Sequence, residues 1–452
     1  MSGATSAADV DRVATRRPWG RAAAWLLLLA PFFFASYGLA TWLAARRAEV
    51  GFVVFGWERH IPLLPWTIIP YWSIDVLYGI SLFVCTSRAE LDAHARRLLT
   101  AQVVAVTCFI LFPLRFSFPR PTLDGVPGAL FAVLASFDKP FNQAPSLHIA
   151  LLVILWVRYA RHVRRRGWAA WLLHGWFALI GLSVLTTYQH HFIDVPTGAL
   201  LGFACLWIWP DEGPSPLAGL RVTDEPKRRR LALRYGLGAC LLSALATWLG
   251  GFGLWLLWPA ISLALVALNY AAIGAPGFQK GADGRMSLAV AGLFAPYLLG
   301  AWINTKLWPG DGRRFAAVGD GVSVGRLLPG AAVEAARFAG VVDLCAELPG
   351  PGRGGAAYAA LPMLDLVTPT PAQLREASDA IERARRYGPV LVCCALGYSR
   401  SAAAVAAWLL TTGRAGDTDA AVAQVRAARP RLVLDAAARS AIVDAATAET
   451  SA

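Results

Sequence analysis

Charged residues are scarce in this chain of 452 residues, and they are scarcest inside its long apolar runs. Only 16% of the residues are charged, whereas 56% are hydrophobic. Within the apolar runs, few ionisable residues are found beyond Asp75 and His174. A transporter needs ionisable groups deep in several of its spans, so their scarcity argues against that class of protein. The composition instead predicts that much of the chain lies in a membrane.

Cysteine is also sparse, with seven in the chain. Four of them lie in apolar runs without paired spacing, namely Cys85, Cys108, Cys205 and Cys240. This pattern excludes a disulfide framework and the common zinc motifs. We therefore expect neither a metal nor a cofactor.

Lysine is rare, so most of the 42 basic residues are arginines, and many of these cluster in short loops between apolar runs. The formal net charge of +13 could indicate a nucleic-acid partner. Clusters in such loops are instead typical of signals that orient a membrane protein, and they suit contact with anionic lipid. We therefore expect an integral membrane protein and no nucleic-acid partner. The arginine-rich, alanine-rich and lysine-poor composition favours a bacterial inner membrane.

The apolar runs predict six spans up to residue 210. A tail of residues 1–21 is rich in arginine and precedes an uncharged run, Ala22–Ala45, that is too long for a signal peptide. The tail is expected in the cytoplasm, and residues 22–210 are expected to form a membrane domain. A charged loop, residues 88–97, should separate the second span from the third. The five later spans are expected within residues 61–87, 98–114, 145–159, 167–189 and 192–210.

A polar linker, residues 211–230, ends in four basic residues and precedes further membrane segments within residues 231–305. The uncharged run Tyr235–Gln279 is long enough for two spans, with a turn expected at Gly250 and the glycine after it. A ninth span over residues 286–305 satisfies the length rule. The chain is thus expected to have eight or nine spans.

The composition changes at about Gly310. Residues 310–452 alternate short apolar runs, separated by Gly and Pro, with alanine-rich helical stretches such as Pro371–Tyr387. This alternation predicts a soluble α/β domain. The predicted fold class is therefore a polytopic α-helical membrane bundle followed by a soluble α/β domain.

The most informative stretch of this domain is Leu391–Ser401, in which five residues separate Cys394 from Arg400. An apolar run typical of a buried strand precedes the stretch, and a helical run follows it. The turn would present backbone N–H groups and the positive end of a helix to a dianion, and these groups favour a thiolate at Cys394. Arg400 can bind two phosphate oxygens at once. The stretch therefore predicts a phosphate site with its own nucleophile.

This arrangement resembles the loop of the cysteine-dependent protein tyrosine and dual-specificity phosphatases. The resemblance implies a nucleophile at Cys394 and phosphate binding by Arg400 and Gly397. It also implies roles for Ser401, whose hydroxyl assists departure of the thiolate, and for Asp365, an upstream general acid.

One position departs from that family, which usually has histidine directly before the nucleophile and here has Cys393. A thiol cannot tune the loop as an imidazole does, and Cys393 could pair with the nucleophile in a disulfide. Residues 425–430 nevertheless resemble the closing helix of the family. Two alternatives follow: a phosphatase for a phosphoprotein or soluble phosphate ester, and a degraded site that binds phosphate only as a sensor.

Three polar stretches lie at the ends of predicted spans in the membrane half, where an apolar bundle has no structural use for them. They are Arg115–Pro121, Ala144–His148 and Tyr188–Asp194. His190 and Asp194 are four residues apart, so they share a face if they lie on one helix. The carboxylate could then hold one ring nitrogen while the other nitrogen attacks phosphorus.

The other two stretches could supply the remaining groups for such a reaction. His148 would protonate the leaving oxygen. Arg115 and Arg120 would neutralise the phosphate, and Ser146 would help to bind it. Any one histidine alone could equally be an interfacial residue at a span end. His191 is expected to be structural, because its spacing to the aspartate is three.

Together these stretches resemble the three-motif signature of the type-2 phosphatidic-acid phosphatase superfamily, most closely its inositolphosphorylceramide-synthase-like branch. The resemblance, over residues 60–210, implies catalytic roles for His148, His190 and Asp194. It departs at Pro113, where the superfamily has lysine. A membrane phosphatase or phosphotransferase for membrane lipid phosphates is implied, with either water or a lipid hydroxyl as the acceptor.

Two phosphate chemistries in one chain suggest consecutive steps on one lipid. Basic loops such as residues 161–166 should face the cytoplasm, which puts His190 on the opposite side. Eight spans would put residues 310–452 in the reducing cytoplasm, which preserves a thiolate, and nine would put them outside. The length of residues 286–305 slightly favours a ninth crossing, and both alternatives stay open.

Overall fold

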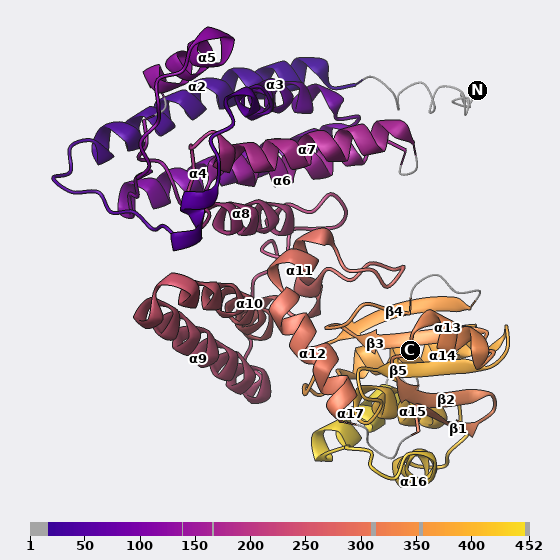
Figure 1. Cartoon of the computed structure of the whole chain (residues 1–452). Coiled ribbons are helices and arrows are strands. Elements are labelled where there is room, and N and C mark those ends of the chain that lie inside the picture. Colours follow the sequence, from indigo (N-terminus) through magenta and orange to yellow (C-terminus); the bar gives the residue numbers. More distant parts are fainter. Residues whose placement is uncertain (1–16, 138, 165–166, 309–312, 352–355, 448–452) are drawn as a thin grey trace, which may run out of the picture. The chain divides into compact units, whose positions relative to one another are not determined.

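The computed structural model describes residues 17–137, 139–164, 167–308, 313–351 and 356–447 (Figure 1). Residues 1–16 of the predicted tail and residues 165–166 of the basic loop lie outside the described residues. The chain forms two compact units, of which the first is Met1–Ser215 with Leu249–Phe252 and the second is Pro216–Trp248 with Gly253–Ala452.

The first unit is a bundle of apolar helices. Its buried faces carry side chains such as Ala101, Ile154 and Val184, whereas large apolar side chains such as Leu27 and Trp171 are exposed. Such exposure is expected where lipid rather than water surrounds a helix. The helices are α2 (Trp19–Ala44), α3 (Ile68–Val84), α4 (Arg88–Leu111), α5 (Gly125–Phe137), α6 (Leu147–Ala160), α7 (Trp168–Thr186) and α8 (Asp194–Ile208), with the short helices η1 (Gly56–His60) and η2 (Pro65–Thr67).

Two helices of the expected six-span core are short. Helix α6 has 14 residues and α8 has 15. At about 1.5 Å per residue they extend about 21 to 23 Å, less than a hydrocarbon core of about 30 Å. Among the described residues, the six helical stretches long and apolar enough to cross a membrane are Trp19–Ala44, Pro65–Val84, Arg88–Leu111, Trp168–Thr186, Pro226–Leu249 and Gly251–Ile273.

Residues 88–97 form the first part of helix α4 and are not the charged loop expected from the sequence. Ser87 caps the helix, because its side chain accepts a hydrogen bond from the backbone N–H of Glu90. The charged side chains are neutralised by ion pairs, including a buried one between Arg97 and Asp211 at 3.0 Å. The charged residues therefore mark the capped start of helix α4, where ion pairs neutralise them.

The second unit begins with further apolar helices. The turn expected at Gly250 is confirmed, since Gly250 and Gly251 have φ angles of 58° and 47°. Helix α9 begins at Pro226, so the basic end of the expected linker is helical. The elements are α9 (Pro226–Leu249), η3 (Gly251–Leu256), α10 (Leu257–Leu268), η4 (Asn269–Ile273), η5 (Ala275–Phe278), α11 (Leu288–Leu293) and α12 (Ala295–Leu307).

The segment expected as a ninth span is broken into two helices. Helices α11 and α12 have 6 and 13 residues and are separated at Phe294. Pro296 stands in the first turn of α12, where a missing N–H needs no partner. Neither helix reaches the roughly 20 residues of a straight crossing.

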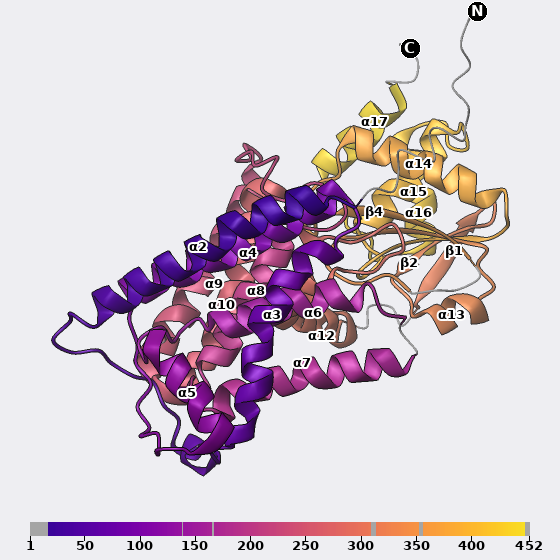
Figure 2. The same cartoon turned by 90° about the horizontal axis from the view of Figure 1, so that it is seen from above.

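An α/β domain completes the second unit, as predicted. Its sheet has the order β1-β2-β5-β3-β4, and only the β1–β2 pair is antiparallel. The strands are β1 (Phe315–Gly319), β2 (Val322–Arg326), β3 (Gly340–Cys345), β4 (Ala357–Met363) and β5 (Val390–Cys394). Helix α13 (Gly330–Ala335) packs on one face, and α14 (Pro371–Arg385), α15 (Arg400–Thr411), α16 (Thr418–Ala428) and α17 (Ala436–Thr447) pack on the other (Figure 2). The parallel strands end at one edge, where α/β sheets hold their ligands.

Candidate active sites

Cys394 is the last residue of the central strand β5, at the ligand-binding edge of the sheet. Its neighbour Cys393 packs with Leu391 and Val341 on the opposite face, because successive side chains of a strand alternate. Both thiols are free. Burial, reinforced by the nearby Asp343 carboxylate, raises the pKa of the Cys393 thiol well above its ordinary value. Cys393 is therefore an inert core residue behind the loop.

The residues after Cys394 curl around its sulfur. The backbone N–H of Gly397 donates to Sγ at 3.3 Å, and the Ser401 hydroxyl lies 3.4 Å from it. Gly397 has a φ of +79°, and a Cβ there would lie 2.4 Å from the carbonyl carbon of Gly325. Only glycine suits this position, and the loop stays closely packed on β2.

Arg400 opens helix α15 with its guanidinium buried under the loop. Its Nη1 donates to Glu347 Oε2 and to the Met363 carbonyl, both at 2.8 Å. Its Nη2 donates to Glu347 Oε1 at 2.6 Å and to Asp365 Oδ1 at 2.8 Å. Among the described residues, the buried Nε has no hydrogen-bond partner. One strong donor of this side chain is thus available for an anion.

The two carboxylates beside Arg400 differ in their ionisation. Burial opposes ionisation of Glu347, but the charge of Arg400 outweighs it and lowers the Glu347 pKa. Burial dominates at Asp365 and raises its pKa, although Arg400 opposes the rise. Asp365 therefore keeps its proton to higher pH than an ordinary carboxyl group, which suits a general acid.

Sequence reasoning missed Glu347. It follows strand β3, just as Asp365 follows β4 and Cys394 ends β5. An acidic residue two positions after the end of a buried strand was the available signal, because parallel strands end at the same edge.

Arg429 supports the loop from behind. Its buried guanidinium donates to the backbone carbonyls of Leu396 and Gly397, at 3.2 and 3.4 Å. The two hydrogen bonds hold these carbonyls toward Arg429. The segment at residues 425–430 was singled out from the sequence, but this particular contact was not.

In the first unit, His190 lies between a carboxylate and a hydroxyl. Its Nδ1 is 3.1 Å from Asp194 Oδ2, and its Nε2 is 3.1 Å from Ser146 Oγ. All three side chains are buried. Helix α8 begins only at Asp194, so the turn before the helix, rather than a shared helix face, brings the pair together.

His148 occupies the first turn of helix α6, two residues after Ser146. Its ring stacks on Tyr71 with the centroids 4.2 Å apart. Its Nε2 is buried, and no described residue forms a hydrogen bond with it. The ring is thus held in place with one nitrogen available.

The two predicted phosphate-binding arginines differ in their surroundings. Arg120 donates to the Tyr188 carbonyl at 2.9 Å and to Gln189 Oε1 at 3.0 Å, directly before His190. Arg115 is exposed and donates to the Val50 carbonyl at 3.0 Å. The described contacts bring Arg120, but not Arg115, to the histidine segment.

His191 has both ring nitrogens engaged. Its Nε2 accepts the Ser117 backbone N–H at 3.1 Å, so Nδ1 carries the proton and donates to Glu58 Oε2 at 3.0 Å. Burial opposes ionisation of Glu58, but hydrogen bonds from His191 and two backbone amides outweigh it and lower the Glu58 pKa. Sequence reasoning missed Glu58, which lies in a polar loop far from the motif. The structural role expected for His191 stays a prediction.

Two separate segments of the chain match phosphatase families, so the protein is a phosphatase built by fusion of two domains. Residues 95–211 match the PAP2 superfamily, and residues 331–446 match the family described as dual specificity phosphatase, catalytic domain. Its membrane-spanning candidates and its PAP2 domain make it an integral membrane protein. No curated protein matches the chain.

Solved structures match the C-terminal domain. Human DUSP28 is 24% identical, and the match covers 30% of this chain and 96% of that chain with a TM-score of 0.28. Tk-PTP in the active form is 27% identical over 30% of this chain and 97% of that chain, with a TM-score of 0.27. PTPMT1 in complex with PI(5)P is 17% identical over 31% of this chain and 98% of that chain, with a TM-score of 0.28.

Proposed function

We propose that the C-terminal domain removes a phosphate monoester through a phosphocysteine at Cys394. The observation that carries this proposal is the assembly of Cys394, Arg400 and Asp365 at one sheet edge. The buried Nε of Arg400 also lacks a partner in the part of the chain that the structure describes. A bound phosphate would accept from this Nε and from the loop N–H groups. Asp365 would release Arg400 and turn toward the ester oxygen.

The proposed reaction has two displacements. The Cys394 thiolate attacks phosphorus, an S–P bond forms, the P–O ester bond breaks, and the leaving alcohol takes the proton of Asp365. Water then attacks the phosphocysteine and gives its proton to the Asp365 carboxylate. The S–P bond breaks with the Ser401 hydroxyl, 3.4 Å away, donating to the departing thiolate.

We further propose that the membrane domain acts on a lipid phosphate through His190. Its Nε2 attacks phosphorus while Asp194 holds the Nδ1 proton, and His148 gives a proton to the leaving oxygen. An N–P bond thus forms as the P–O bond to the leaving group breaks. Water or a lipid hydroxyl then attacks phosphorus and gives its proton to His148, while the N–P bond breaks. The support is the placement of the His190 ring between Asp194 and Ser146, both at 3.1 Å.

In this proposal Arg120 and Ser146 bind the phosphate of the lipid, and Arg115 joins them by leaving the Val50 carbonyl. The Arg115–Pro121 stretch favours the inositolphosphorylceramide-synthase-like branch. The domain limits would be a tail at 1–21, a membrane phosphatase domain at 22–210, a linker at 211–230, added spans at 231–305 and the cysteine phosphatase at 310–452. A bacterial inner membrane would suit the arginine-rich loops.

Turnover of an aryl phosphate by the full-length protein in detergent tests the cysteine site. The expected result is loss of turnover in Cys394→Ser and a fall of about 100-fold or more in Asp365→Ala, in a His190→Ala background. Turnover that survives Cys394→Ser would contradict the proposal and favour a phosphate-binding sensor domain. Release of phosphate from vesicle lipids that survives His190→Ala in a Cys394→Ser background would contradict the membrane site.

A further inference from the structure

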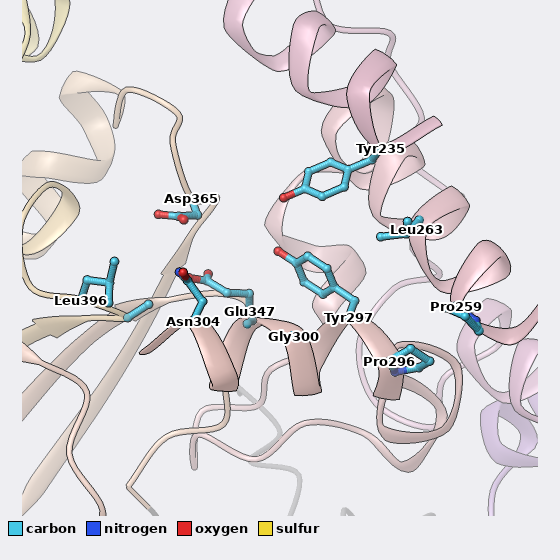
Figure 3. A pocket seen from close by; sticks show the side chains of 12 residues that line it. Tyr235, Pro259, Leu263, Pro296, Tyr297, Gly300, Asn304, Glu347, Asp365 and Leu396 are labelled. Carbon is cyan, nitrogen blue, oxygen red and sulfur yellow. The ribbon is translucent and has the colours of Figure 1, made fainter. Parts of the chain in front are cut away.

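The catalytic edge of the α/β domain borders a slot whose other walls are apolar helices of the same unit (Figure 3). The slot has a volume of about 350 Å³ and is lined by α9, α10, α12 and the catalytic edge. Small-molecule sites usually have volumes of roughly 300 to 1,000 Å³. The slot is therefore large enough to hold part of a substrate beside the Cys394 loop.

The slot is polar at one end and apolar at the other. Asp365 and the loop residue Leu396 lie at the polar end, and the hydroxyls of Tyr235 and Tyr297 point toward it (Figure 3). Leu263 and two prolines line the other end. An amphiphile with a phosphate head matches this division.

The apolar end lies along segments that are candidates to cross the membrane. Tyr235 belongs to the candidate span Pro226–Leu249, and Leu263 belongs to Gly251–Ile273. On α12 the lining extends from Pro296 to Asn304, about 12 Å along the helix axis at about 1.5 Å per residue. The slot thus runs from the catalytic edge along the membrane helices.

Specific contacts hold the catalytic edge against these helices. Lys280, between α10 and α11, donates to Asp343 Oδ2 and to the Cys345 carbonyl on β3, both at 2.6 Å. The Lys280 and Asp343 side chains are both 0% exposed. Tyr270, at the end of a candidate span, donates to the Asp365 backbone carbonyl at 3.0 Å. The helices of this unit and the segment after them therefore help to build the Cys394 site.

We propose that the Cys394 site takes the phosphate monoester of a membrane lipid, which enters from the bilayer between α9, α10 and α12. The proposal rests on the phosphatase activity proposed above for Cys394. The phosphate occupies the loop, the polar link to the acyl chain lies between Tyr235 and Tyr297, and the chain lies along Leu263.

A phosphopeptide suits this slot poorly. Its backbone N–H and C=O groups each need a partner when buried, and the apolar end offers a leucine and prolines. An acyl chain has no such groups, and its transfer from water into an apolar slot is favourable. A lipid is therefore the occupant that the lining favours.

Gly300→Leu tests the slot. A Cβ on Gly300 would meet no atom within 4 Å, so leucine fits the helix and fills the slot that Gly300 lines. Gly236→Leu is the matched control, because Gly236 lies on α9 with the same open surroundings and does not line the slot. Leu263→Trp obstructs the slot from α10 as a second variant.

The measurement uses the full-length protein with His190→Ala, in phosphatidylcholine vesicles that contain dioleoyl phosphatidic acid. We expect Gly300→Leu and Leu263→Trp to lower kcat/KM for this lipid, relative to a soluble aryl phosphate, by about tenfold or more. The Gly236→Leu control should keep the ratio within about twofold of the parent.

An unchanged ratio in both slot variants, or a preference of the parent for a phosphotyrosine peptide over the lipid, would overturn the lipid substrate while leaving the phosphatase intact. Absence of any Cys394-dependent turnover, of the lipid and of the aryl phosphate alike, would overturn the proposed function and this inference with it.

Discussion

At the scale of single residues, Arg400 connects the chemistry of the C-terminal domain to its stability. A buried guanidinium is costly unless carboxylates surround it, and Glu347 and Asp365 supply them. Glu347 is 5% exposed and holds both terminal nitrogens, whereas Asp365 is 38% exposed and holds one. Glu347 is therefore the permanent partner, and Asp365 is the one that phosphate can replace.

Glu347→Ala is expected to destabilise the α/β domain by roughly 3 to 5 kcal/mol, because it leaves the Arg400 charge buried and poorly compensated. Hydrogen exchange of peptides from β3 and β5 measures the effect in the full-length protein. Asp419→Ala is the control, since Asp419 forms its pair with Arg439 at 88% exposure and should contribute less than about 1 kcal/mol. Equal protection in both variants would contradict the role of Glu347.

The proton on Asp365 sets the expected pH dependence of the cysteine site. Burial raises the Asp365 pKa, so the acid form persists to higher pH than in an ordinary carboxyl group. Turnover should therefore hold on the acid side of this pKa and fall as pH rises through it. A profile of kcat against pH in the His190→Ala background measures the fall, and Asp365→Ala should remove that limb. A limb that persists in Asp365→Ala would assign it to another group.

At the scale of elements, the loop between β5 and α15 depends on a close approach to β2. Gly397 adopts a conformation that favours glycine, and Gly325 of β2 leaves no room for a side chain. Arg429 after α16 fixes the loop carbonyls on its other side. The loop is thus shaped by two elements distant in sequence.

Gly397→Ala should lower Cys394-dependent turnover by about 100-fold or more, because the loop must shift and its N–H groups then miss the phosphate. The measurement is kcat/KM for an aryl phosphate in the His190→Ala background. Gly416→Ala is the control, since a Cβ there meets no atom within 4 Å. A Gly397→Ala protein with parent activity would show that the loop tolerates the shift.

At the scale of the whole molecule, the buried Lys280–Asp343 pair joins the α/β domain to the segment between α10 and α11. Lys280 precedes α11 and the domain follows α12, so the ends of the broken segment both lie at the domain. On α12, Pro296 lines the slot toward its apolar end, whereas Asn304 lies near Glu347 (Figure 3). Helices α11 and α12 therefore suit a segment that enters the membrane and returns on the same side.

Compartment reporters placed after Gly281 and after Ala452 should report the same side of the membrane, and one inserted after Gly250 should report the opposite side. The reason is that Pro226–Leu249 and Gly251–Ile273 are each long and apolar enough to cross, whereas α11 and α12, with 6 and 13 residues, are each too short for a straight crossing. Opposite results for the Gly281 and Ala452 reporters would establish a ninth crossing. That outcome would also require the Lys280–Asp343 pair to be absent in the membrane.

The sequence by itself determined the fold class and most of the proposed chemical groups. Long uncharged runs identify membrane helices because their apolar side chains are poorly solvated by water. The Cys394 loop is recognisable because its nucleophile and its arginine lie on one turn. The same contiguity identified His190 and Asp194. Two predicted boundaries were wrong. The charged residues 88–97 belong to helix α4, because they are capped and paired, and the segment expected as a ninth span is divided into α11 and α12, with Pro296 in the first turn of α12.

Only the tertiary structure decided which distant groups complete each site. Glu347 and Arg429 reach the Cys394 loop, and Glu58 reaches His191, across long sequence separations. No local periodicity encodes such pairs, because they depend on which strands and helices become neighbours. The slot beside Asp365 has the same origin, since its walls come from membrane helices and from a sheet that meet only in the folded chain.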